Sequence, residues 1–167
     1  QLDPLMELFT SFLRNGFDAL DFWSAQYKAT SLADASGRLM AAGVLLDALR
    51  ENIIGTQVSE ISKGDALNVY TFSGAIKQVS VITSTDASNI DIDLNSSPIP
   101  PGYTLVDGFK IGVNEATADG EYRDLSGLPA YGEPDARVTL DQVSMSVLKG
   151  ESGVINLDPF ECLILVF

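Results

Sequence analysis

Hydrophobic residues follow two different spacings along the chain, and the change from one to the other falls close to residue 56. Before it, apolar residues recur at helical intervals in two stretches. After it, short runs alternate with a period near two, and Gly, Pro, Asn and Asp separate them. The pattern predicts an α+β protein. A helix–strand–helix segment over residues 1–58 precedes an antiparallel β-sandwich over residues 59–167, with the boundary in residues 55–64.

The first helix is bracketed by clear start and stop signals. Asp3 can cap a helix N-terminus and Pro4 is tolerated at the first helical position. The dipeptide Asn15-Gly16 is typical of a left-handed C-terminal cap. Between these signals lies an apolar stripe at helical spacing, made of Leu5, Leu8, Phe9, Phe12 and Leu13.

A strand and a second helix are predicted to follow. Neither face of residues 17–23 is clearly polar, which suits a strand covered on both sides, as in a parallel sheet. Residues 24–36 form a polar connection that ends in a turn signal. The second helix is predicted over residues 39–52, with one broad apolar side and a charged side that can face water.

The second part of the chain reads as many short strands with frequent turns, which is typical of an antiparallel sandwich. The predicted strands cover residues 67–72, 76–83, 90–94, 104–106, 109–113, 137–140, 143–148, 154–157 and 162–167. The segment 114–134 is rich in Gly and Pro and predicts an irregular loop.

Composition removes several classes of function. The chain has 167 residues, 46% of them hydrophobic, which is enough for a packed core. The 23 acidic and 10 basic residues give a net charge of −13, which argues against nucleic-acid and membrane-surface partners. The absence of His excludes Ser/His/Asp triads and zinc sites built on imidazole. The sole cysteine, Cys162, lies in an apolar run and is predicted to be a buried core thiol.

No apolar run reaches the roughly 20 residues that a membrane-spanning helix needs. Because Gln1 is not an initiator methionine, we expect the chain to begin after processing or inside a longer protein.

Four segments together carry a family resemblance. Phe22-Trp23-Ser24 resembles the end of a last barrel strand, residues 31–39 the turn after it, and residues 41–49 the final barrel helix. Residues 155–165 resemble the closing strand pair of an accessory sandwich. In this order, the parts resemble the C-terminal part of a retaining glycoside hydrolase of the (β/α)8 clan, of the β-agarase and β-porphyranase kind found in marine polysaccharide degradation.

The resemblance implies a role in polysaccharide degradation without a complete active site. The catalytic carboxylates of that clan follow the fourth and seventh barrel strands, which would precede Gln1. We therefore expect no catalytic residue in this chain, no activity of the chain alone, and double displacement by the parent enzyme. Trp23 is the candidate sugar-stacking platform, and Tyr27 can line the same cleft. Packing in a core or between domains is the alternative role for Trp23.

The implied partners are a polysaccharide or oligosaccharide and the remainder of a larger enzyme chain. The implied location is secreted or extracellular. No cofactor is expected.

The acidic residues suggest two further candidate sites. Asp18 and Asp21 would point to opposite faces of a strand and make a poor catalytic pair. Asp91 and Asp93 share a face, so they could contribute to a calcium site, although a solvated acidic edge explains them as well. No metal ligand is assigned. Three tyrosines in or beside predicted loops could either contact a glycan or pack at the rim of the sandwich: Tyr103, Tyr122 and Tyr131.

Two alternative functions stay open at this point. The chain could be a non-enzymatic structural subunit, such as a virion or filament protein, whose first helix forms a homo-oligomer contact. It could also be a free-standing carbohydrate-binding module.

Overall fold

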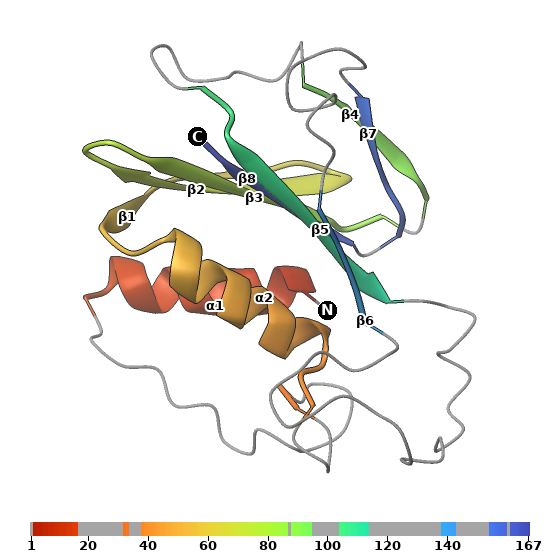
Figure 1. The fold of residues 1–167 in the computed structure, drawn as a ribbon, viewed down its shortest axis with the longest axis horizontal. Coiled ribbons are helices and arrows are strands. Elements are labelled where there is room, and N and C mark those ends of the chain that lie inside the picture. The colour runs from red at the N-terminus through yellow and green to blue at the C-terminus, as the bar shows by residue number, and fades with distance from the viewer. Residues whose placement is uncertain are drawn as a thin grey trace.

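A computed structural model describes residues 2–16, 32–33, 38–86, 88–94, 104–113, 138–142, 154–159 and 161–167. Two helices cover one face of a six-stranded antiparallel sheet, and a two-stranded ribbon packs on the other face (Figure 1). This arrangement confirms the predicted α+β class. Within the described residues, no helix is long and apolar enough to cross a membrane.

The helices are α1 (Leu2–Arg14) and α2 (Ala41–Asn52). The strands are β1 (Thr56–Lys63), β2 (Leu67–Gly74), β3 (Gln78–Ser84), β4 (Ile90–Asp93), β5 (Asp107–Val113), β6 (Val138–Gln142), β7 (Val154–Leu157) and β8 (Cys162–Val166). The large sheet has the order β1-β2-β3-β8-β5-β6, and β4 pairs with β7 in the ribbon. All of these pairings are antiparallel.

The last strand, β8, lies inside the sheet because its sequence can be buried on both faces. All five of its residues are buried, and it pairs with β3 on one side and β5 on the other. Cys162, Ile164 and Val166 face the helices, whereas Leu163 and Leu165 face the ribbon. A strand without a polar face is stable only where both faces are covered.

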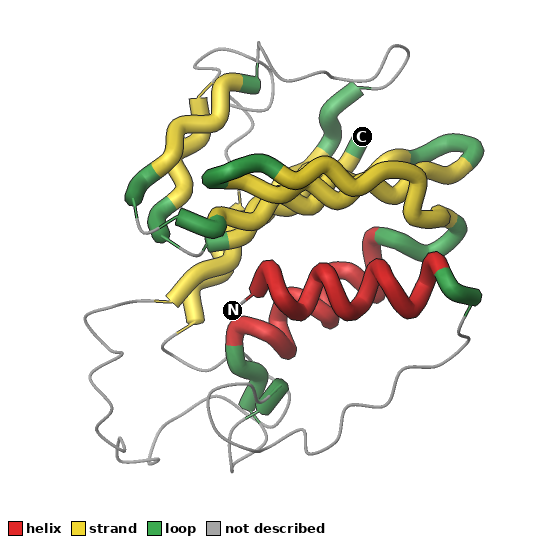
Figure 2. Tube along the Cα trace, turned by 180° about the vertical axis from the view of Figure 1, so that it is seen from behind, coloured by secondary structure: helices red, strands yellow, loops and turns green. Residues whose placement is uncertain are grey.

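The inner core lies between the helices and the sheet, and both helices contribute to it. Buried residues of α1 and α2 pack in one cluster with side chains of β2, β3, β5 and β8. Phe9 of α1 and Phe72 of β2 make a tilted aromatic contact with ring centroids 6.5 Å apart. The helices and the sheet therefore bury a single apolar surface together. Figure 2 shows both helices lying along the same face of the large sheet.

The outer core lies between the sheet and the ribbon. Ile92 of β4 and Leu157 of β7 meet Ile82, Leu163 and Leu165 of the large sheet. The ribbon buries alternate residues, as the patterns of β4 and β7 show, and its other face is exposed. This second layer makes the fold a small sandwich of unequal sheets.

Both predicted helices are confirmed, and their ends have clear local causes. α1 ends at Arg14, and Gly16 follows with φ +72°, as the Asn-Gly signal predicts. In α2, a Cβ at Gly43 would overlap the backbone carbonyl oxygen of Leu32. That carbonyl also accepts a hydrogen bond from the amide of Met40 at 2.9 Å. The backbone at the start of α2 therefore packs directly against the backbone of Leu32.

Two strand predictions are corrected. Residues 55–64, assigned to a boundary, contain the eight-residue strand β1. Its polar pattern hides the strand because the register with β2 shifts between Val58 and Glu60, and such a bulge breaks strict alternation. Residues 104–106 are not a strand, since β5 begins at Asp107.

Several other predictions cannot be compared with the structure. The strands expected over 17–23 and 143–148 and the loop over 114–134 lie outside the described residues. The division of the chain at residues 58 and 59 stays a prediction.

A truncated chain tests whether the helices and the sheet are separable. A variant comprising residues 56–167 would bare the inner face of the sheet, including Tyr70, Phe72 and Ile164, each of which is at most 1% exposed. Burial of each such side chain is worth about 1.5–3 kcal/mol. We expect this variant to bind a hydrophobic dye and to lose its near-ultraviolet circular dichroism.

The full chain with Ile76→Ser is the control, because Ile76 is 94% exposed and its replacement should leave the fold intact. Cooperative unfolding of residues 56–167 would show instead that the sheet is an independent domain.

Candidate functional site

The residues that the sequence singles out for sugar binding, Trp23 and Tyr27, lie outside the described residues. Their assignment stays a prediction. Asp18 and Asp21 also lie outside the described residues. The described residues instead contain two charged clusters, one on each face of the large sheet, and neither was found from the sequence.

The inner cluster is centred on Asp3, in the first turn of α1. Three side chains of the sheet donate hydrogen bonds to the same oxygen, Oδ1 of Asp3. The donors are Asn68 Nδ2 at 2.9 Å, Tyr70 Oη at 2.7 Å and Thr83 Oγ1 at 2.5 Å. Asn68 and Tyr70 lie on the inner face of β2, and Thr83 is beside them on β3. Asp3 therefore ties the helix to the sheet rather than capping its own helix.

The electrostatics of this cluster favour an ionised Asp3. Burial raises the pKa of Asp3, but the hydrogen bonds from Thr83, Tyr70 and Asn68 outweigh it and leave the pKa below its usual value. Burial and the neighbouring carboxylate raise the pKa of Tyr70 strongly, so this phenol stays a donor. The thiol of Cys162 is fully buried, which raises its pKa and confirms the predicted core role.

A second contact joins α1 to the sheet at the surface. Lys63 Nζ of β1 donates a hydrogen bond to Glu7 Oε1 of α1, and this bond raises the pKa of Lys63. Both side chains are exposed, so this pair adds little to stability. The carboxylate of Asp3 is consequently the stronger polar link between the helix and the sheet.

The outer cluster is centred on Glu161, which directly precedes β8 and is 7% exposed. Its Oε2 accepts a hydrogen bond from the backbone amide of Asp158 at 2.9 Å. The same oxygen forms an ion pair with Lys110 Nζ at 3.1 Å. Lys110 Nζ also donates to the carbonyl of Asn156 at 3.3 Å. A Cβ on Gly112 would overlap the Glu161 side chain, so the glycine provides the space for the carboxylate. The cluster connects β5, the turn before β8 and the ribbon strand β7.

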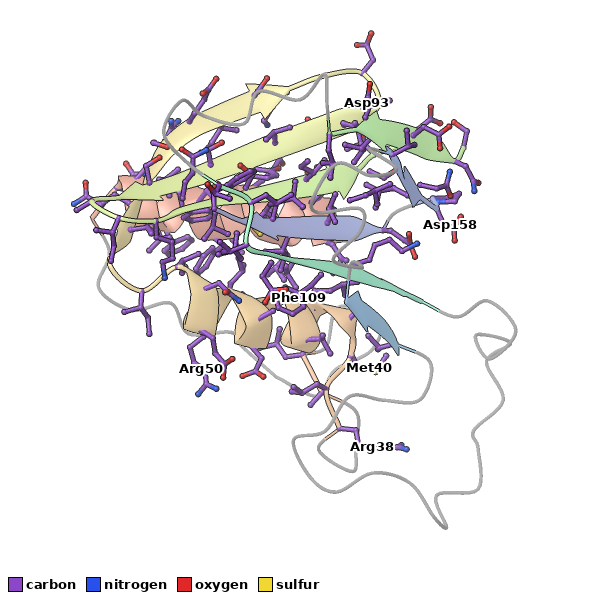
Figure 3. The ribbon with its side chains drawn as sticks, turned by 45° about the horizontal axis from the view of Figure 1, so that its top comes forward. Arg38, Met40, Arg50, Asp93, Phe109 and Asp158 are labelled. Carbon is purple, nitrogen blue, oxygen red and sulfur yellow. The ribbon has the colours of Figure 1, made fainter. Side chains whose placement is uncertain are left out.

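A ladder of amides and carboxylates covers the exposed face of the ribbon. Asn89 Nδ2 donates to Asp158 Oδ1 at 2.6 Å and to Asn156 Oδ1 at 3.2 Å. Asn156 Nδ2 donates in turn to Asp91 Oδ1 at 2.9 Å. Figure 3 shows Asp158 and Asp93 at opposite ends of this ribbon.

Asp91 and Asp93, the candidate calcium ligands, are both exposed on this face. Within the part of the chain that the structure describes, no group of three or more His, Cys, Asp or Glu side chains could hold a metal ion.

A signal for the inner cluster was present in the sequence. Asn68 occupies an inward position of β2, in alternation with Tyr70 and Phe72, and a polar residue at a core position needs a buried partner. The identity of that partner was not predictable, because Asp3 is 65 residues away along the chain. Its position just before Pro4 suggested a capping role instead.

Comparison with known proteins identifies a fold and no family. No family model matches the chain, and no curated protein matches it by sequence. Among solved structures, it is similar to a GH30 endoxylanase from Clostridium papyrosolvens C71, with a TM-score of 0.53 at 10% sequence identity. The match covers 99% of this chain and 37% of the endoxylanase chain. The fold is therefore similar to part of that endoxylanase chain, and this chain spans about a third of its length.

Replacing Asp3 tests the inner cluster. Asp3→Asn removes the charge that three donors surround, and we expect the free energy of unfolding at pH 7 to fall by about 1–3 kcal/mol. Because the folded-state pKa of Asp3 is lowered, its contribution is complete above the unfolded-state pKa of about 4 and is lost as the pH falls through the folded-state value. Urea unfolding between pH 2 and 7 should therefore show a smaller loss of stability on the acid side for Asp3→Asn than for the wild type.

Asp47→Asn is the matched control. Asp47 is an exposed carboxylate of α2 that pairs with Arg50 on the surface, so its replacement should change stability by less than about 0.5 kcal/mol. Equal effects of the two variants would contradict the anchoring role of Asp3.

Removing one or both charged side chains of the Lys110–Glu161 pair tests the outer cluster. Glu161→Leu leaves the half-buried Lys110 without its carboxylate and the Asp158 amide without its acceptor, so we expect a loss of about 3 kcal/mol in urea unfolding. The double variant Lys110→Met/Glu161→Leu should be more stable than Glu161→Leu alone, because no unpaired charge remains. Additive losses in the double variant would show that the two side chains act independently.

Proposed function

We propose that this chain is the C-terminal portion of a polysaccharide-degrading glycoside hydrolase. It supplies the end of the catalytic barrel and an accessory β-sandwich, and it lacks the catalytic carboxylates. The observation that carries the proposal is the fold match, in which nearly the whole chain, helices and sheet together, superposes on part of an endoxylanase. The parent enzyme would use two carboxylates in a double displacement.

The architecture of the described residues supports a scaffolding role for the sheet. The helices share their core with the sheet, and Asp3 fixes α1 against β2 and β3. A helical layer that is locked to a rigid sheet can hold an adjoining substrate site in a constant position. In this proposal Trp23 and Tyr27, which follow α1 in the sequence, contact the sugar rings.

The sole tryptophan makes the sugar-binding part directly testable. Every change in tryptophan fluorescence of this chain reports on Trp23. Titration with xylan-, agarose- and porphyran-derived oligosaccharides should give a saturable change in emission for one of them, because stacking places the indole against the apolar face of a sugar. Tyr27→Ala should weaken that binding about threefold to tenfold, and Ile76→Ser, at an exposed position in the turn between β2 and β3, should not.

Two results would count against this proposal. An emission spectrum of a buried indole that no oligosaccharide changes would assign Trp23 to packing. Release of reducing sugar by the 167-residue chain alone would show that it carries its own catalytic residues.

One observation favours the structural-subunit alternative. Leu8 and Leu13 of α1 are 44% and 39% exposed, which is high for large apolar side chains on one helix. Sedimentation of the chain distinguishes the two proposals, since a closed oligomer that Leu8→Ser dissociates would support assembly through α1.

A further inference from the structure

Both helices end with the same side-chain hydrogen bond. Asn15, just after α1, donates from Nδ2 to the carbonyl oxygen of Ser11 at 2.7 Å. Asn52, the last residue of α2, donates from Nδ2 to the carbonyl oxygen of Ala48 at 2.8 Å. In α1 the asparagine gives the Ser11 carbonyl a second donor, because that oxygen also accepts a hydrogen bond from the Asn15 backbone amide at 3.1 Å. The two positions differ in the residue that follows, which is Gly16 after Asn15 and Ile53 after Asn52.

The end of α1 is open to solvent. Asn15 and Gly16 are both exposed, and Gly16 adopts a left-handed φ of +72° with no atom near the place of a Cβ. Among the described residues, the Asn15 amide donates to the carbonyls of Ser11 at 3.1 Å and Phe12 at 3.2 Å, and the Gly16 amide donates to that of Leu13 at 3.2 Å, all within the last turn. Exposed terminal turns of this kind open at little cost in free energy. The backbone nitrogen of Gly16 then becomes accessible to the Asn15 side chain, and no side chain on Gly16 hinders the approach.

We propose that Asn15 is a site of spontaneous deamidation that removes the C-terminal cap of α1. The Gly16 backbone nitrogen gives up its proton to solvent and attacks Cγ of Asn15, and ammonia leaves as a five-membered succinimide closes. Water then adds to either carbonyl of the ring and opens it to aspartate or isoaspartate. The net reaction consumes one water, releases one ammonia and converts a neutral amide into a carboxylate. The chain has a single Asn-Gly dipeptide, so Asn15 is the site where this chemistry is least hindered.

The product cannot rebuild the original helix end. A carboxylate at position 15 has no proton to donate to the Ser11 carbonyl. It also places negative charge beside the last carbonyls of α1, at the negative end of the helix dipole. The last turn therefore loses its side-chain hydrogen bond and opens more readily after deamidation, and the change is irreversible. The Asp3 anchor lies at the opposite end of the helix and is unaffected.

Peptide mapping of the aged full-length chain tests the site. The chain is incubated at pH 8 and 37 °C without denaturant, digested with trypsin and sequenced by mass spectrometry. We expect the peptide of residues 15–28 to gain the mass of an amide-to-acid change first, with isoaspartate at position 15. The peptide of residues 51–63 carries Asn52 and is the matched control, with the same hydrogen bond and a branched next residue. Equal rates for the two peptides would overturn the proposal, as would modification of Asn15 only in chain unfolded by urea.

The consequence for α1 is tested separately with Asn15→Asp, which mimics one product. We expect a Tm lower by about 1–4 °C and faster hydrogen exchange at residues 13–16, with exchange in α2 unchanged. Asn15→Gln, which keeps a neutral amide, should resist the modification. Unchanged exchange in Asn15→Asp would show that the side chain of Asn15 does not hold the helix end.

Discussion

A single carboxylate oxygen determines how the helical layer sits on the sheet. Hydrophobic contacts between α1 and the inner core are strong but not directional, so they would tolerate a helix that slides or rotates. Oδ1 of Asp3 must instead meet three donors that come from two strands, and it can do so in one position only. Those donors are themselves buried, with Asn68, Tyr70 and Thr83 at most 6% exposed, so a displaced helix would leave all three unsatisfied. The interaction therefore specifies the docking of α1, and the apolar core supplies most of the driving force.

The distance along the sequence between interacting residues explains what could be predicted from the sequence. The spacing of hydrophobic residues and the residues typical of helix ends depend only on nearby positions. These signals predicted both helices, most strands of the large sheet and the α+β class. The buried position of Cys162 followed from its apolar surroundings. The failures have non-local causes. β1 was missed because a bulge breaks its alternation, and the two charged clusters were missed because their members meet only after folding.

The contacts on the outer face of the sheet explain how a ribbon much smaller than the sheet is held in place. The ribbon has two short strands, so it can cover only part of a six-stranded sheet. It is fixed by apolar contacts at Ile92 and Leu157 and by the polar link from Lys110 to Asn156 and Glu161. Glycine at position 112 allows the Glu161 carboxylate to lie flat on β5. Packing and charge pairing together therefore hold a ribbon that would be marginal by itself.

The two charged clusters lie back to back across the same pair of strands. Thr83, which donates to Asp3, pairs in register with Cys162, and the next residues, Ser84 and Glu161, are joined by a backbone hydrogen bond of 3.0 Å. Glu161 faces the ribbon, whereas Cys162 faces the helices, because successive residues of a strand point to opposite sides. Both covering layers are thus anchored at one end of β3 and β8. At the other end of the sheet, Ile76 is 94% exposed in the turn between β2 and β3. The two polar anchors therefore lie at one end of the sheet, where α1 begins, and the end of α1 that precedes Trp23 in the sequence lies away from them. In the proposed enzyme, the length of α1 and the stability of its last turn would then set the position of Trp23 at the substrate site.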